Sequence, residues 1–166
     1  MLASLTIRPA TTDDWPSIWP FWHAIVAEGR TYTWSPDTGE DQARGLWMLP
    51  APGEVWVGQD EASGAVVASA TLRPNQPGLG SHVAHGAFMV DPAHTGRGIG
   101  RALAERMLDR ARERGFTAMQ FNAVVADNPA VALWRSLGFV VVGRVPDGFR
   151  RPDGTLVDLL VLHRCL

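Results

Sequence analysis

The chain has 166 residues, of which 46% are hydrophobic and 19% charged, and its formal net charge is −2. Such a composition is typical of one globular domain that can bury its own core, so we expect a single domain over residues 1–166. The near-neutral charge argues against a nucleic-acid partner, and the lack of any run of ~20 apolar residues or signal-peptide pattern favours a cytoplasmic protein without membrane contact.

The first half of the chain contains patterns of both strands and helices. Residues 5–9 alternate apolar and polar side chains and predict a first strand. Residues 12–14 provide N-cap chemistry for a helix that runs towards Glu28 and is kinked at Pro20. A second helix is expected over residues 37–48, and strands over residues 54–58, 66–72 and 83–90.

The second half begins with a long amphipathic helix from about Gly98 to Arg114, closed by Gly115. Residues 119–125 are nearly all apolar and predict a strand that is buried on both faces. A short helix is expected over residues 129–137, and strands over residues 139–145 and 156–163. Because strands and helices are interleaved, with a strand–helix–strand unit in the middle, the pattern predicts an α/β domain.

A glycine-rich turn joins the strand 83–90 to the long helix. Its sequence is Thr95-Gly96-Arg97-Gly98-Ile99-Gly100-Arg101. Glycines at a helix start let several backbone N–H groups point outward, and together with the positive end of the helix dipole they form a cradle suited to phosphates. Arg97 and Arg101 add positive charge beside it. A glycine turn without a ligand is the alternative, which three alternating glycines at a helix start make less favoured.

The identity of the phosphate ligand is narrowed by what the chain lacks. The glycine spacing does not fit the G-x-G-x-x-G pattern of dinucleotide-binding folds, and four or more elements precede it. All fifteen of the Lys and Arg residues are arginine, so a P-loop lysine and a Schiff-base lysine are both excluded. Cys165 is the only cysteine, which excludes a disulfide framework or a cysteine zinc cluster within one chain. We expect no metal.

Two motifs in the right order resemble the signatures of the GNAT superfamily of N-acetyltransferases. Phe88-Met89-Val90-Asp91-Pro92, followed by residues 95–103, resembles the strand and glycine turn of the first signature. Residues 128–139 resemble the second signature, and residues 6–14 look like the usual first strand and helix. The resemblance covers nearly the whole chain. It implies a single-domain GNAT fold of the α/β class, with a mixed, mostly antiparallel sheet of six to seven strands flanked by about four helices.

Three positions depart from the family pattern. Thr95 stands where glutamine or arginine is usual, which matters little if backbone amides bind the phosphate. Asn128 lies one residue closer to the following helix motif than the pattern has it. Trp134 replaces the tyrosine that in many relatives protonates the departing thiolate, and an indole N–H cannot donate a proton at useful pH. The usual acid is therefore absent.

The resemblance implies an acetyl-CoA-dependent N-acetyltransferase that moves an acetyl group directly to the primary amine of a small molecule, in a ternary complex. The tail and the N-terminal third look loosely like the phosphinothricin-type branch. A protein or peptide N-acetyltransferase is the rival within enzymes, and a non-catalytic acyl-CoA-binding module is the rival outside them. A homodimer is an assembly that the resemblance allows.

The cofactor site implied by the resemblance follows the first signature. A backbone N–H near Met89 would polarise the thioester carbonyl, and Val90 would pair with the pantetheine arm like an added strand. Asn122 is the one polar side chain within residues 121–125 and would line the gap where the cofactor enters, unless it only bonds neighbouring backbone. The expected cofactor-binding residues are Phe88, Met89, Val90, Thr95, Gly96, Arg97, Gly98, Ile99, Gly100, Arg101, Asn122 and Asn128.

The candidates for acid–base chemistry are fewer than the cofactor-binding residues. His85 titrates in the right range for a base that accepts the amine proton, with a kcat/KM limb expected near pH 6.5; a histidine without catalytic function is the alternative. Glu28 lies where the family builds its amine pocket, although a solvated helix carboxylate is the simpler interpretation. Tyr32 is the only tyrosine and therefore the only phenolic acid. Tyr32, Trp34 and Trp47 are expected to wall the same pocket.

Overall fold

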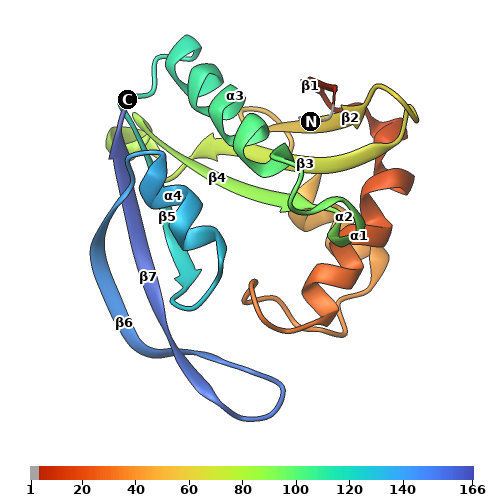
Figure 1. Ribbon diagram of the computed structural model, residues 1–166. Helices are drawn as coiled ribbons and strands as arrows, with labels where there is room; N and C mark the ends of the chain where they lie inside the picture. Colours follow the sequence, from red (N-terminus) through yellow and green to blue (C-terminus); the bar gives the residue numbers. More distant parts are fainter. Residues whose placement is uncertain (1–3) are drawn as a thin grey trace.

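The computed structural model describes residues 4–166 and contains one seven-stranded sheet with helices on both faces (Figure 1). The strand order is β1-β2-β3-β4-β5-β7-β6, and every neighbouring pair is antiparallel except β4 and β5. The strands are β1 Leu5–Pro9, β2 Glu54–Asp60, β3 Val66–Pro74, β4 Val83–Val90, β5 Ala118–Val125, β6 Val140–Arg150 and β7 Leu156–Cys165. The expected mixed, mostly antiparallel sheet is confirmed.

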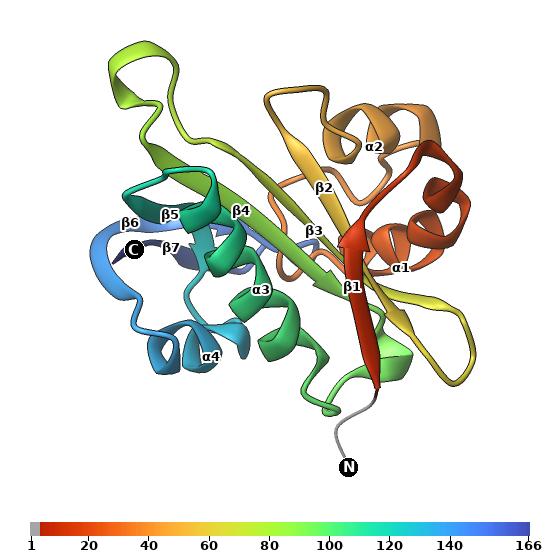
Figure 2. The same ribbon diagram turned by 90° about the horizontal axis from the view of Figure 1, so that it is seen from above.

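In the described part of the chain, four α-helices cover the sheet: α1 Trp15–Ala27, α2 Glu40–Trp47, α3 Ile99–Glu113 and α4 Ala130–Ser136. Helices α3 and α4 lie on one face, and α1 and α2 on the other (Figure 2). Each pair buries its own apolar cluster, because side chains alternate between the two faces along every strand. On β4, for example, Phe88 packs with the α3 cluster while Met89 is buried in the α1–α2 cluster. No helix within residues 4–166 is long and apolar enough to span a membrane.

Helix α2 begins later than expected. The sequence indicated a start near Asp37, whereas the helix starts at Glu40. The Thr38 N–H instead donates to the Ser35 carbonyl at 3.0 Å, which makes a separate turn, and Gly39 serves as the N-cap in an extended conformation. The segment between α1 and α2, residues 28–39, is consequently a loop.

The last hairpin is longer than the sequence indicated. Strand β6 reaches Arg150, five residues beyond the expected end at Val145. The chain continues past Val145 with a register shift between Val145 and Phe149 and a positive φ of 53° at Asp147. The bulge accommodates these residues within the strand. The β6–β7 hairpin therefore projects beyond the rest of the sheet (Figure 1).

Candidate active site

The parallel strands β4 and β5 separate part-way along their length. They pair only from Val83 to His85 on β4 and from Ala118 to Gln120 on β5, and Figure 1 shows the two strands diverging beyond that point. Beyond that point β5 is no longer paired with β4. The expectation that residues 119–125 are buried on both faces is therefore wrong. Asn122 is exposed instead.

The ladder with β3 decides which backbone groups of β4 face this gap. The Val83 carbonyl accepts from the Asn75 N–H and the Asp91 N–H donates to the Val67 carbonyl, both at 2.8 Å. Backbone groups point alternately to the two sides along an antiparallel strand. Val83 and Asp91 bond towards β3, so the backbone groups of the odd-numbered Met89 face β3 as well. The N–H and C=O groups of Phe88 and Val90 face the gap.

Tyr32 stands at this open stretch of β4. Its hydroxyl donates to the Phe88 carbonyl at 2.7 Å, and its ring stacks on Trp34 with 4.9 Å between ring centroids. Burial raises the pKa of the Tyr32 hydroxyl above its usual range. The phenol therefore keeps its proton and can act as a hydrogen-bond donor beside Phe88.

The glycine turn lies at the other end of the open stretch. Gly96 and Gly98 have φ values of 75° and 78°, which glycine adopts without a steric penalty. The first backbone bond at the start of α3 runs from the Ala102 N–H to the Gly98 carbonyl at 3.1 Å. The amides of residues 96–101 have no bonding partner within the described part of the chain. They meet the positive end of a 15-residue helix and form an anion cradle.

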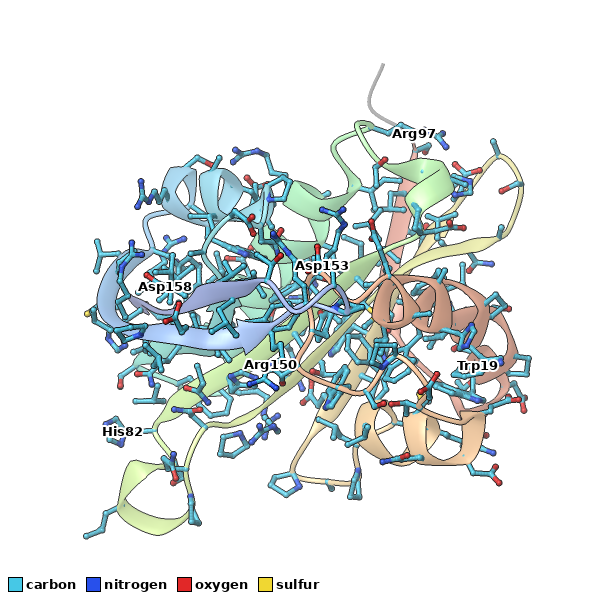
Figure 3. All side chains as sticks on the ribbon, turned by 90° about the horizontal axis from the view of Figure 1, so that it is seen from below. Trp19, His82, Arg97, Arg150, Asp153 and Asp158 are labelled. Carbon is cyan, nitrogen blue, oxygen red and sulfur yellow. The ribbon has the colours of Figure 1, made fainter. Side chains whose placement is uncertain are left out.

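Side chains fix the position of this turn. The Arg97 guanidinium lies 3.7 Å from the Asp60 carboxylate at the end of β2, and Figure 3 marks it at the edge of the molecule. Arg101 donates to the Ser136 hydroxyl of α4 at 2.7 Å. A Cβ at Gly100 would lie 3.6 Å from Val90, so the helix start packs closely on the end of β4. The cradle and the open stretch of β4 are therefore continuous.

A cavity of about 350 Å³ lies on the other side of Tyr32, between the loop after α1 and the β6–β7 hairpin. It is lined by Gly29, Tyr32, Thr33, Trp34, Ser35, Pro36, Gly148, Phe149, Arg150 and Pro152. The hairpin tip meets the end of α1 there, because a Cβ at Gly29 would lie 2.5 Å from Pro152 Cγ. Figure 3 shows this tip, marked by Asp153, next to α1.

Sequence analysis identified only the Tyr32 and Trp34 wall of this cavity. Gly148, Phe149, Arg150 and Pro152 were missed, because no element or role was predicted between the strands 139–145 and 156–163. A signal available in the sequence was the pair Arg150-Arg151 beside Pro152. Trp47 is completely buried behind Trp34 and supports this wall rather than lining the cavity.

His85 lies at the closed end of the gap, three residues before Phe88. Its Nδ1 lies 3.0 Å from the Gln120 carbonyl, which can only accept, so Nδ1 carries the hydrogen and Nε2 is the acceptor. Burial, with the Arg73 guanidinium as a second cause, lowers the pKa of His85 to about 4. The imidazole is neutral near pH 7, and a titration near pH 6.5 is not expected in this environment.

The remaining predicted residues have other contacts. Glu28 is exposed, lies 3.5 Å from Arg30, and does not line the cavity. The Asn122 amide donates to Asn75 at 2.7 Å and its oxygen accepts from Gln120. Its expected burial is wrong, because β4 has already turned away.

Asn128 directly precedes Pro129, the N-cap of α4. Its Oδ1 accepts from the Ala130 N–H at 2.9 Å, as an Asn side chain does at a helix start. The amide nitrogen of Asn128 and the second lone pair of its Oδ1 remain for a ligand. The Thr95 hydroxyl donates to the Pro92 carbonyl within the turn at 3.2 Å, and the Ile99 side chain is buried. Within residues 4–166, no three His, Cys, Asp or Glu side chains gather to hold a metal.

Trp134 is buried in an aromatic cluster on the α3 side of the sheet. Its ring centroid lies 5.0 Å from that of Phe88, 4.7 Å from Phe121 and 5.8 Å from Phe139. These contacts hold α4 and β4 together. Trp134 thus packs directly beneath the open stretch of β4.

We expect Trp134→Phe to keep most of the wild-type turnover. The loss of unfolding free energy should be smaller than the ~3–5 kcal/mol typical of removing a whole buried aromatic ring. Steady-state kinetics and urea unfolding measure the two effects. A turnover loss of about 100-fold with unchanged cofactor binding would contradict a packing role, because that is the scale of a lost acid–base group.

Comparison with protein families gives a match over residues 18–139 to the model described as the acetyltransferase (GNAT) family. Among curated proteins, the chain is similar to N-acetyltransferase aca1 of Schizosaccharomyces pombe, with 41% identity over 80 residues. The match covers 48% of this chain and 38% of that relative. The chain therefore matches well under two thirds of the relative's length.

Two solved structures match over nearly the full length of the chain. A GCN5-related N-acetyltransferase from Kribbella flavida is 49% identical with a TM-score of 0.92, covering 98% of each chain. A GNAT superfamily phosphinothricin acetyltransferase from Sinorhizobium meliloti, solved in complex with AcCoA, is 25% identical with a TM-score of 0.86. That match covers 100% of this chain and 89% of the other.

Proposed function

The chain belongs to the GNAT family of acetyltransferases, and on this premise we propose that it transfers an acetyl group from acetyl-CoA directly to the primary amine of a small molecule. The observation that carries the proposal is the position of Tyr32. Its hydroxyl bonds the open stretch of β4 at Phe88, and the same residue lines the cavity beside the hairpin. A cofactor groove and an acceptor cavity thus meet at one point.

Two sets of backbone N–H groups support the cofactor groove, namely those of the glycine turn and those of β4 that face the gap. The amides of residues 96–101 and the α3 dipole bind the pyrophosphate, with Arg97 and Arg101 alongside. The register between β3 and β4 leaves the N–H of Phe88, not that of Met89, facing the gap. We therefore assign polarisation of the thioester carbonyl to the Phe88 N–H, and pairing with the pantetheine arm to Val90. When bound, acetyl-CoA supplies the activated acetyl thioester. Asn122 and the Asn128 amide nitrogen flank the same groove.

A small acceptor is favoured over a peptide because the β6–β7 hairpin bounds the cavity on one side. The β6–β7 hairpin contacts the end of α1 through Pro152 and Gly29. An extended peptide needs an open groove along its length, whereas a cavity of about 350 Å³ matches a small molecule. The protein-substrate alternative would require the hairpin tip to move away from α1.

The chemistry assigned to side chains is modest, as direct transfer requires mainly positioning. Tyr32 retains its proton, so we assign its hydroxyl a hydrogen bond to the departing thiolate, in exchange for the bond to the Phe88 carbonyl, rather than complete protonation of the thiolate. His85 is too weak a base to remove an ammonium proton directly and lies about 10 Å along the strand from Phe88. We assign its Nε2 to holding water through which that proton leaves. Glu28, outside the cavity, is the next candidate for the proton path.

Turnover with a panel of acceptors tests the proposed function. Release of CoA thiol is measured with small primary amines, and in parallel with unrelated peptides bearing free N-termini. We expect release with at least one small amine and none above background with the peptides. Thiol release with peptides alone supports the protein-substrate alternative. Binding of acetyl-CoA without release in any reaction supports the non-catalytic module.

The pH dependence of the rate tests the assignment of His85. Since its pKa is about 4, the imidazole is neutral across the range from pH 6 to 9. We expect kcat/KM to rise only with the titration of the acceptor amine, and His85→Ala to lower the rate more than threefold without changing the shape of the profile. A limb near pH 6.5 that disappears in His85→Ala would contradict this assignment and identify His85 as a direct base.

A further inference from the structure

The acceptor cavity has a single charged group in its lining, and that group is positive. Of the described residues that line it, Arg150 alone is charged. The other lining groups are aromatic, small or hydroxyl-bearing, with Tyr32, Trp34 and Phe149 as the large walls. No lining carboxylate is present to hold a second ammonium group. The cavity therefore disfavours a polycationic amine.

Arg150 differs from the neighbouring arginines in having no ion-pair partner. Arg144 pairs with Asp158 at 2.6 Å, and Arg151 pairs with Asp127. Within residues 4–166, the Arg150 side chain makes no hydrogen bond or ion pair. Figure 3 labels Arg150 on the hairpin together with Asp153 and Asp158. Asp153 bonds the Thr155 N–H at 2.8 Å, and Asp158 pairs with Arg144, so both acids are already engaged.

The backbone holds Arg150 in place although its side chain is unpaired. Arg150 is the last residue of β6 and pairs with Leu156 of β7. The preceding residue, Phe149, is buried against Val125 and Leu159, and the following residue is anchored to Asp127. A guanidinium on a fixed strand end offers planar, bidentate donors to a carboxylate or phosphonate.

We propose that the acceptor is a zwitterionic amine, whose single anionic group binds the Arg150 guanidinium while its amine reaches the acetyl group near Phe88. This inference rests on the proposed function and deepens it by naming the class of acceptor. The anionic group fixes the orientation of the molecule in the cavity, and Arg150 is a specificity-determining residue. An uncharged analogue of the same shape lacks this contact and leaves Arg150 unpaired.

The test compares matched acceptors in wild type and two variants. Amino acids and aminophosphonates are assayed beside their uncharged amides or esters. For the best zwitterion we expect kcat/KM about 10- to 100-fold above that of its uncharged partner, as for a hydrogen-bonded charge. In Arg150→Gln, the kcat/KM values of the zwitterion and its uncharged partner should lie within threefold of each other, mainly because KM for the zwitterion rises. Arg150→Lys should retain part of the preference for the zwitterion.

Arg135→Gln is the matched control, because Arg135 is exposed on α4 and does not line the cavity. It should keep the wild-type ratio. Equal turnover of zwitterions and uncharged amines by wild type would overturn the inference and leave the proposed function intact. An equal loss on both acceptor forms in folded Arg150→Gln would also overturn it. Absence of thiol release with every acceptor would overturn the proposed function itself.

Discussion

Gly98→Val is expected to weaken acetyl-CoA binding by tenfold or more. Gly98 is the N-cap of α3 and has a φ of 78°, a conformation that a β-branched residue does not adopt without strain. Relief of that strain rotates the peptide groups of the turn and moves the amides that face the phosphates. Calorimetric titration of acetyl-CoA into the folded variant measures the effect.

Gly64→Val is the matched control for Gly98→Val. Gly64 has a φ of 71° in the turn between β2 and β3, and a Cβ there meets nothing within 4 Å. The same kind of strain is therefore introduced away from the glycine turn. We expect Gly64→Val to lose stability but to bind acetyl-CoA like wild type. Equal affinities in the two variants would remove the basis for placing the phosphates at the glycine turn.

Tyr32→Phe is expected to lower kcat by about 100-fold, the lower end of what a hydrogen-bond donor to developing negative charge contributes. The phenyl ring keeps the stacking on Trp34, whereas the hydroxyl beside Phe88 is lost. Because the phosphate cradle is untouched, the dissociation constant of acetyl-CoA should change less than threefold. Single-turnover rates and calorimetry separate the two quantities.

A purely structural role for Tyr32 predicts a different outcome. Loss of one hydrogen bond would then reduce the free energy of unfolding by ~1 kcal/mol and leave turnover within threefold of wild type. Trp134→Phe is a useful comparison, since it also alters an aromatic group near Phe88 while leaving Tyr32 in place. Similar kcat values in Tyr32→Phe and Trp134→Phe would count against the assignment of Tyr32.

The sequence was most informative where local rules determine the backbone. The glycines of the turn 95–101, its position at the start of a helix and the apolar stripe of that helix are local features, and the structure has them as predicted. The strand ends at Val83 and Val90 were also predicted correctly. These residues carry the resemblance to the GNAT family, and the comparison with protein families confirms that resemblance.

The sequence could not predict features that depend on distant contacts. The separation of β4 from β5 depends on pairing across 35 residues, and without it Asn122 looked buried. The register of β4, which favours Phe88 over Met89, follows from bonds to β3. The pKa of His85 is lowered by burial, with Arg73 of β3 as the second cause. Arg150 joins the cavity only because the hairpin meets the end of α1.

Initial-velocity kinetics with both substrates varied test the central claim most directly, since that claim is direct transfer where the groove meets the cavity. With the best small amine of the panel, double-reciprocal plots should give lines that intersect, as expected when both substrates must be bound together. Parallel lines would indicate an acetylated enzyme intermediate and would contradict the account. Failure of every small amine to release CoA thiol would contradict it as well.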